Sequence, residues 1–91
     1  MTIRDIFEKT AKHFKMAKVD DGTYENDRFV LSHIHELSSI SVRSKDIEYA
    51  DDDTMGAFTY IEAGGYYAGA VYHSSSLPFI EYMLKLTEEA K

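Results

Sequence analysis

Two alternating stretches on either side of a glycine pair constrain the fold more than any other part of the sequence. They read GAFTYIEA and YYAGAVYH, with glycines at 64–65 between them. Two glycines suit a two-residue turn whose backbone needs positive φ. We therefore expect a β-hairpin in which Ala57 lies opposite Tyr72. In this register Tyr60 lies opposite Gly69, and its ring can cover the bare backbone there.

The alternation gives this hairpin two different faces. One face carries mostly small residues, and the other carries Phe58, Tyr60, Tyr67, Val71 and His73. If helices cover the small-residue face, the aromatic face is left open, and tyrosine-rich patches are common at protein interfaces. Alternation does not say which face is buried. Two alternatives to an open aromatic face therefore remain: this face forms the core of the domain, or it is buried in a homodimer interface.

Helical patterns stand at both ends of the chain. Segment 2–19 repeats apolar residues at three- and four-residue steps, with Thr2 as the cap and Asp5 in the first turn. Segment 75–91 has a second apolar stripe, with Ser76 as its cap. Each segment predicts one amphipathic helix.

The middle of the chain indicates strands. Turn formers at 20–27 are followed by residues typical of strands at 28–37, and alternation resumes from Ser39 to Tyr49 as one bent strand or two short ones. The order predicts an α+β fold in a single domain, residues 1–91. It has an N-terminal helix, a three- to four-stranded antiparallel sheet and a C-terminal helix, with both helices on one sheet face.

Charge and composition exclude several classes of function. The 91 residues include no cysteine and carry a net charge of −6. Up to Val19 there are five basic and two acidic residues, and beyond it five basic and fourteen acidic ones. This acidity disfavours direct binding to DNA or RNA. No apolar run is long enough for a membrane span, and the charged start MTIRDIFEKT lacks a signal-peptide core, so we expect a cytoplasmic protein.

An acidic cluster follows the predicted central strands. It consists of Asp46, Glu48, Asp51, Asp52 and Asp53. It lacks the spacing of a calcium loop. A solvated turn that guards a strand edge is one interpretation, and a mimic of a phosphate backbone that docks on a basic protein is another.

The histidines raise the alternative of a metal site. His33 and His35 share one side of a strand, and His73 and Glu36 are alternative candidates for a third ligand. The row Lys9, Lys12, Lys15 and Lys18 forms a diagonal basic band on the first helix. No nucleophile elbow, metalloprotease helix or nucleotide-binding loop is present. We therefore expect a protein that is not an enzyme, with no catalytic residues and no cofactor.

These features favour a binding protein. In size, acidity and helix–sheet order the chain resembles anti-CRISPR and antirestriction proteins of phages and mobile elements, and the immunity proteins of nuclease toxins, without a shared motif. The first hypothesis is an inhibitor that blocks a basic, nucleic-acid-handling protein, steered by the acidic cluster and anchored by Phe58, Tyr60 and Tyr67. A homo-oligomeric structural or regulatory domain that uses the tyrosine-rich face is the second, and a metal-binding domain using His33 and His35 is the third.

Overall fold

The structure of the chain, a computed structural model, describes residues 1–34, 37–45 and 54–89. Within these ranges the helices and strands follow one another as α1 (Ile3–His13), β1 (Ala17–Asp20), β2 (Thr23–Glu25), β3 (Phe29–Ile34), β4 (Ser39–Ser44), β5 (Thr54–Ile61), β6 (Tyr66–Val71) and α2 (Leu77–Glu89). Two short 3-10 turns, Glu62–Gly64 and Ser74–Ser76, flank β6.

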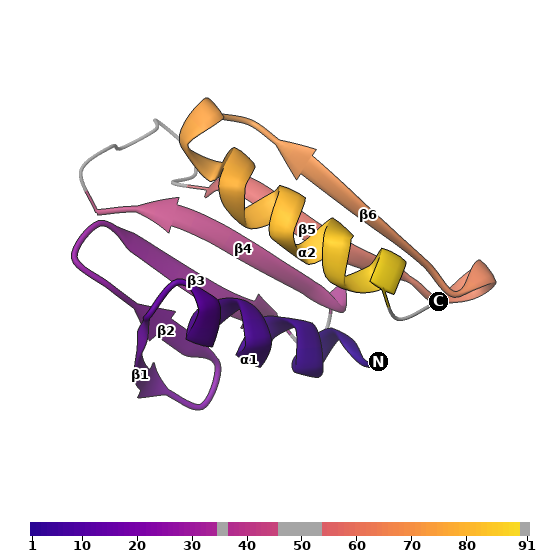
Figure 1. Cartoon of the computed structure of the whole chain (residues 1–91), viewed down its shortest axis with the longest axis horizontal. Coiled ribbons are helices and arrows are strands. Elements are labelled where there is room, and N and C mark those ends of the chain that lie inside the picture. Colours follow the sequence, from indigo (N-terminus) through magenta and orange to yellow (C-terminus); the bar gives the residue numbers. More distant parts are fainter. Residues whose placement is uncertain (35–36, 46–53, 90–91) are drawn as a thin grey trace.

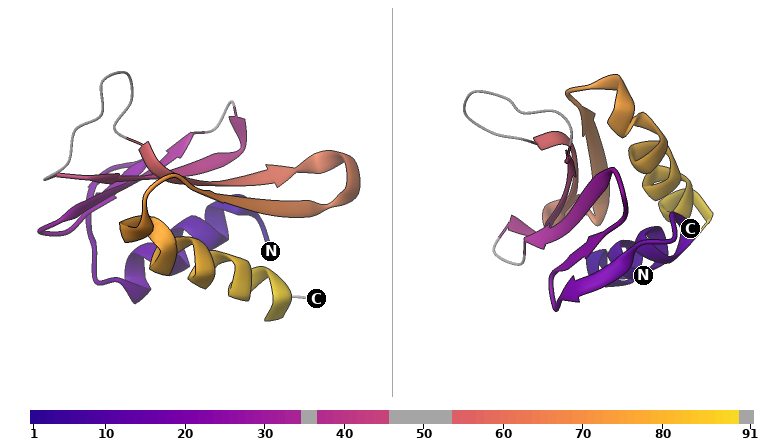
Figure 2. Two further views of the ribbon diagram at one scale, coloured as in Figure 1. Left: turned by 90° about the horizontal axis from the view of Figure 1, so that it is seen from above. Right: turned by 90° about the vertical axis from the view of Figure 1, so that its left-hand side faces the viewer.

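The described strands form one antiparallel sheet in chain order, from β1 at one edge to β6 at the other. Both helices lie on the same face of this sheet (Figures 1 and 2). The predicted α+β order is confirmed, as is the placing of both helices on one face. The predicted number of three to four strands is wrong, because the described residues alone form six. Neither helix in the described ranges has the length and apolar character needed to cross a bilayer.

The two unexpected strands begin where the first helix was predicted to continue. A Schellman motif ends α1: the amide of Met16 donates to the carbonyl of Ala11 (2.9 Å), and the amide of Lys15 to that of Lys12 (3.1 Å). Lys15 has φ +54, a left-handed conformation that reverses the chain. The apolar spacing runs on past this point, but the backbone from Ala17 onward is extended and forms β1.

The predicted cap of α1, Thr2, is confirmed, and Asp5, which was expected only as an acidic residue of the first turn, completes a capping box with it. The Thr2 hydroxyl accepts a hydrogen bond from the Asp5 amide (3.1 Å), and the Asp5 carboxylate accepts one from the Thr2 amide (3.0 Å). The hydrogen bond from the Thr2 backbone amide is the largest cause that holds the pKa of Asp5 below its ordinary value, because it stabilises the charged carboxylate.

The aromatic face of the hairpin is the face that the helices cover. Phe58 is 0% exposed and belongs to one core with Leu31 and Ile40 of the sheet and with residues of both helices. The expectation of helices over the small-residue face is therefore wrong. A Cβ on Gly69 would lie 2.4 Å from Cγ2 of Ile80, so the missing side chain is what admits α2 to this face.

The hairpin turn also differs from the two-residue turn that the sequence predicted. Ile61 pairs with Tyr66, and the loop between them spans four residues, of which Gly65 has φ +61. Phe58, not Tyr60, lies opposite Gly69. The whole pairing is shifted by two residues, and a shift of two leaves every side chain on its predicted face.

Ser76 links the end of β6 to the start of α2. It was expected to cap the helix, but its buried hydroxyl lies 2.8 Å from the carbonyl oxygen of Met55 and 2.9 Å from that of His73, to which it can donate. A Cβ on Gly56 would approach the Ser76 Oγ to 2.5 Å and the Ala70 carbonyl to 3.3 Å. Gly56 thus makes room for the serine that joins sheet to helix.

Gly56→Ala is expected to destabilise the fold by about 1–3 kcal/mol, because the added methyl overpacks a buried contact and displaces Ser76. Urea unfolding followed by circular dichroism measures the change. Gly64→Ala is the matched control, since a Cβ there meets nothing within 4 Å, and it should change stability by less than about 0.5 kcal/mol. Equal stability of the two variants would contradict this packing argument.

Candidate protein interface

The three aromatic residues predicted to anchor a partner lie together under the helices. Phe58 is buried, and its ring stacks on that of Tyr67 with centroids 5.6 Å apart. The rings of Tyr60 and Tyr67 are 4.7 Å apart, and both side chains are half-buried. Phe58 is therefore a core residue and is not available to a partner, while the two tyrosines extend the core toward the hairpin loop.

Tyr67 fastens the start of the chain to the sheet. Its hydroxyl donates a hydrogen bond of 2.6 Å to the carbonyl oxygen of Met1. Partial burial raises the pKa of Tyr67, and the nearby Tyr60 and Asp5 raise it further, because each disfavours a phenolate. The Tyr67 hydroxyl is thus engaged in a contact within the chain, and its role there is structural.

The other candidates are separated or lie outside the described ranges. Asp46, Glu48, Asp51, Asp52 and Asp53, together with His35 and Glu36, fall in those undescribed residues. Docking of an acidic cluster on a basic protein therefore stays a prediction.

The two described histidines of the metal hypothesis sit in different surroundings. His33 is 8% exposed, and its ring centroid is 5.5 Å from that of Phe7. His73 accepts a hydrogen bond from the Ser75 amide through Nδ1 (3.1 Å) and so caps the turn before α2. Among the described residues, no three of His, Asp and Glu are placed to hold a metal ion.

The opposite face of the sheet is the one without helices (Figure 2). It carries small side chains in neighbouring strands, since Ser39 pairs with Thr59, Ser41 with Ala57, and Ala57 with Ala70. A shallow hollow of about 370 Å³ lies on this face next to Tyr72. Its surface offers few anchoring groups of the size that protein interfaces use.

The two edges of the sheet differ in how they are protected. Edge strand β1 is four residues long, contains Lys18 and Asp20, and has a bulge between them. Edge strand β6 is six residues long, and segment 64–72 contains no charged residue. Charges, bulges and short length are the devices that keep sheet edges from pairing, so β1 is guarded and β6 is not.

Large apolar side chains are exposed along this unguarded edge. Tyr66 is 58% exposed, Val71 43% and Tyr72 66%. Aromatic rings of this kind provide contact area at low cost in side-chain entropy. The uncharged run is visible in the sequence, but only the strand order shows that β6 lies at an edge rather than inside the sheet. The β6 edge is therefore the candidate interface.

Comparison of the chain with protein-family models, with curated proteins and with solved structures gives no match. The function is therefore inferred from the residues and their arrangement.

Tyr67→Phe is expected to flatten the loss of stability at alkaline pH. A raised pKa in the folded state means that the stabilising effect of the neutral phenol is complete below the unfolded value near 10. It is lost as the pH rises through the folded pKa. The free energy of unfolding, measured by urea titration from pH 8 to 11, should thus fall less steeply in Tyr67→Phe than in the unmodified chain. The same slope in Tyr67→Phe and in the unmodified chain would contradict the assignment.

Proposed function

We propose that this protein is a homodimeric structural or regulatory domain, in which the β6 strands of two copies pair and join two sheets into one. The observation that carries the proposal is the uncharged, apolar β6 edge in an otherwise highly charged chain. The tyrosine-rich face of the original homo-oligomer hypothesis is replaced here by the edge of the same hairpin.

The backbone at this edge has groups ready to pair. The Tyr60 amide donates to the Ser38 carbonyl (3.0 Å) and so points away from β6, which leaves the backbone groups of Thr59 and Ile61 to pair with those of Ala68 and Tyr66. Backbone groups alternate in direction along an antiparallel strand. The N–H and C=O groups of Tyr67, Gly69 and Val71 therefore point away from β5, to the side where the described chain has no further strand.

A two-fold axis through Gly69 matches these groups to one another. Antiparallel pairing centred on Gly69 places Tyr67 opposite Val71 of the second copy, an aromatic and β-branched pair that favours sheet formation. On the other face the same register places Tyr66 opposite Tyr72 of the second copy. The large side chains exposed on this edge thus cover one another in a single arrangement.

Charge favours a second copy as the occupant. Two chains of net charge −6 repel each other over most of their surface, and an uncharged seam is where that repulsion is least. A basic partner would be attracted to carboxylates, which segment 64–72 does not have. Self-pairing also protects an edge that would otherwise be open to aggregation.

The absence of an enzymatic role is part of the proposal. Several described side chains that could take part in catalysis have structural contacts instead: the Ser76 hydroxyl bonds backbone carbonyls, and His73 caps a turn. The Thr10 hydroxyl donates to the Ile6 carbonyl (2.7 Å) inside α1. These contacts support a structural or regulatory domain over a hydrolase.

Val71→Lys is expected to weaken dimerisation by about tenfold or more, because it places an ammonium group in an apolar seam, opposite the ring of Tyr67 of the second copy. Analytical ultracentrifugation over a range of concentrations measures the dissociation constant. Val19→Lys adds the same charge to the guarded edge β1 and should leave the constant unchanged. Val71→Pro removes only an outward-facing N–H, so it should also yield monomers. A monomeric unmodified chain at 100 micromolar (about 1 mg/ml), or a dimer that tolerates both Val71 variants, would overturn the proposal.

The register is tested by cross-linking. The chain has no cysteine, so introduced thiols react only with each other. A mixture of Tyr66→Cys and Tyr72→Cys proteins is expected to form a disulfide-linked heterodimer on mild oxidation, because the two positions face each other in the proposed pairing. Neither variant alone should cross-link efficiently. Equal cross-linking of the separate and mixed proteins would contradict the register.

A further inference from the structure

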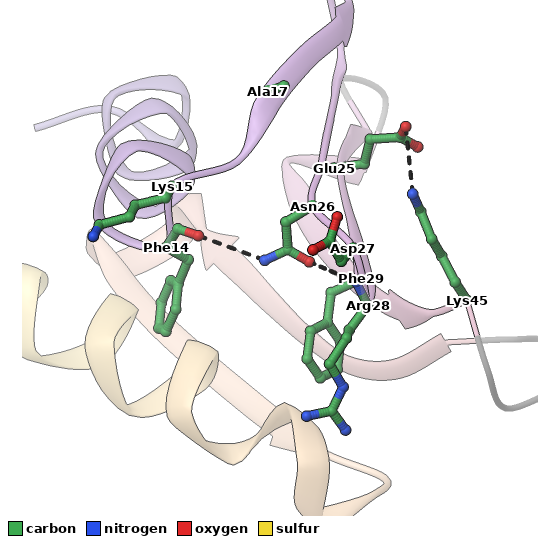
Figure 3. A pocket seen from close by; sticks show the side chains of 9 residues that line it. All are labelled: Phe14, Lys15, Ala17, Glu25, Asn26, Asp27, Arg28, Phe29 and Lys45. Atoms are coloured by element: carbon green, nitrogen blue, oxygen red, sulfur yellow. Dashed lines mark hydrogen bonds and ion pairs between the residues drawn. The ribbon is translucent and has the colours of Figure 1, made fainter.

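A hollow lies at the end of α1, away from the β6 edge. It has a volume of about 590 Å³ and lies between the end of the helix and the loop that joins β2 to β3 (Figure 3). A second hollow of about 280 Å³ shares four of its residues and continues toward the start of α2. We call the two together the α1-end groove; the lining residues that matter here are Phe14, Lys15, Asn26, Arg28, Phe29 and Phe79.

The apolar part of the groove consists of three phenylalanine rings from three different elements. The ring of Phe79 lies 4.2 Å from that of Phe14 and 5.0 Å from that of Phe29, measured between centroids. Phe79 is buried, while Phe14 and Phe29 are half-buried and line the opening. Such a surface can take a ring or an aliphatic chain of a ligand.

Asn26 holds the walls of the groove in place. Its Oδ1 accepts hydrogen bonds from the amides of Arg28 (3.0 Å) and Phe29 (2.9 Å), and its Nδ2 donates to the carbonyl of Phe14 at 3.5 Å. Figure 3 shows this side chain bridging the helix end and the loop. The site is thus organised before any ligand arrives, which reduces the entropy lost on binding.

Arg28 supplies a positive charge beside the aromatic rings. Its guanidinium carbon lies 5.5 Å from the centroid of Phe29. In the described ranges Arg28 makes no ion pair, whereas Lys45 at the far side of the groove is paired with Glu25 (3.4 Å). Asp27 also lines the opening, so the lining as a whole has one more basic than acidic residue. This local excess stands out in a chain of net charge −6.

Lys15 adds an observation from the backbone. It occupies the position after a helix where glycine is usual, because its φ of +54 is unfavourable for a side chain. Non-glycine residues in this conformation cluster at functional sites. Its side chain turns away from Arg28 in Figure 3, but four flexible carbons let the ammonium reach an anion in the groove. A lysine at this position provides charge at the expense of stability.

We infer that the α1-end groove binds a small organic carboxylate, with its carboxylate on Arg28 and Lys15 and its apolar body on Phe14, Phe29 and Phe79. The planar guanidinium matches a carboxylate, and the volume of the groove lies in the range of small-molecule sites. The inference is independent of dimerisation, because the groove is formed by α1, the β2–β3 loop and α2 rather than by β6.

The test compares 3-phenylpropionate with its uncharged amide by two-dimensional NMR of the isotope-labelled chain. We expect the acid to shift the amide signals of Phe14, Arg28 and Phe29 with a dissociation constant of about a millimolar, as befits a small probe, and the amide to bind at least about tenfold more weakly. Arg28→Gln should weaken binding of the acid to the same extent. Arg43→Gln, which removes the same charge from β4, is the control and should bind normally.

A second pair of variants separates charge from folding. Lys15→Gly should raise the urea midpoint by about 0.5 M through relief of the backbone, and at the same time weaken binding of 3-phenylpropionate. Ser38→Gly, at the other described non-glycine residue with positive φ (+47), should raise stability without affecting binding. Equal binding of acid and amide, or full binding by both Arg28→Gln and Lys15→Gly, would overturn the inference.

Discussion

The close approach of α2 to the sheet is the contact on which the rest of this structure depends. Gly56 and Gly69, on neighbouring strands, leave space for Ser76 and Ile80 of the segment that turns back over the sheet. Ser76 then ties this segment to the carbonyl of Met55. Because these two glycines place no side chain of their own between sheet and helix, α2 packs closely on this face, and Phe58 of the same face is buried in the core.

This contact also decides which parts of the molecule are left for binding. With α2 over one face of the β5–β6 hairpin, the other face carries small side chains beside the exposed Ile61, Tyr66 and Tyr72, and the outer edge of β6 keeps its apolar residues in solvent. The α1-end groove lies toward the other half of the sheet, where α1 stops early and its last turn meets the β2–β3 loop through Asn26. Pairing of two copies at the β6 edge would therefore leave the α1-end groove open to a ligand.

Local patterns predicted those elements whose signals lie within a few residues. The capping box of Thr2 and Asp5 is a contact over three residues, and β3 and β4 follow alternation or β-branched composition. Local patterns gave a wrong prediction for the segment after α1. Its apolar spacing continues that of a helix, but a left-handed residue at Lys15 and pairing of β1 with β2 outweigh the periodicity.

In the candidate sites, too, local features can be predicted from the sequence and the tertiary arrangement cannot. The uncharged run 64–72 and the histidine and tyrosine positions can be read from the sequence, but the edge position of β6 cannot. The groove was not predicted, since Phe14, Phe29 and Phe79 are brought together only when helices and loop pack, and no local pattern marks them.

By itself the sequence determined the helix–sheet–helix order, the antiparallel hairpin and the membership of its two faces, because strand alternation has a period of two whatever the exact turn. The tertiary structure alone decided which face is buried. The buried face is the one that carries Leu31, Ile40 and Phe58, and Gly56 and Gly69 admit α2 to it. Burial of large apolar side chains and steric fit between segments distant in the sequence thus act on the same face, and they leave the β6 edge and the α1-end groove at the surface.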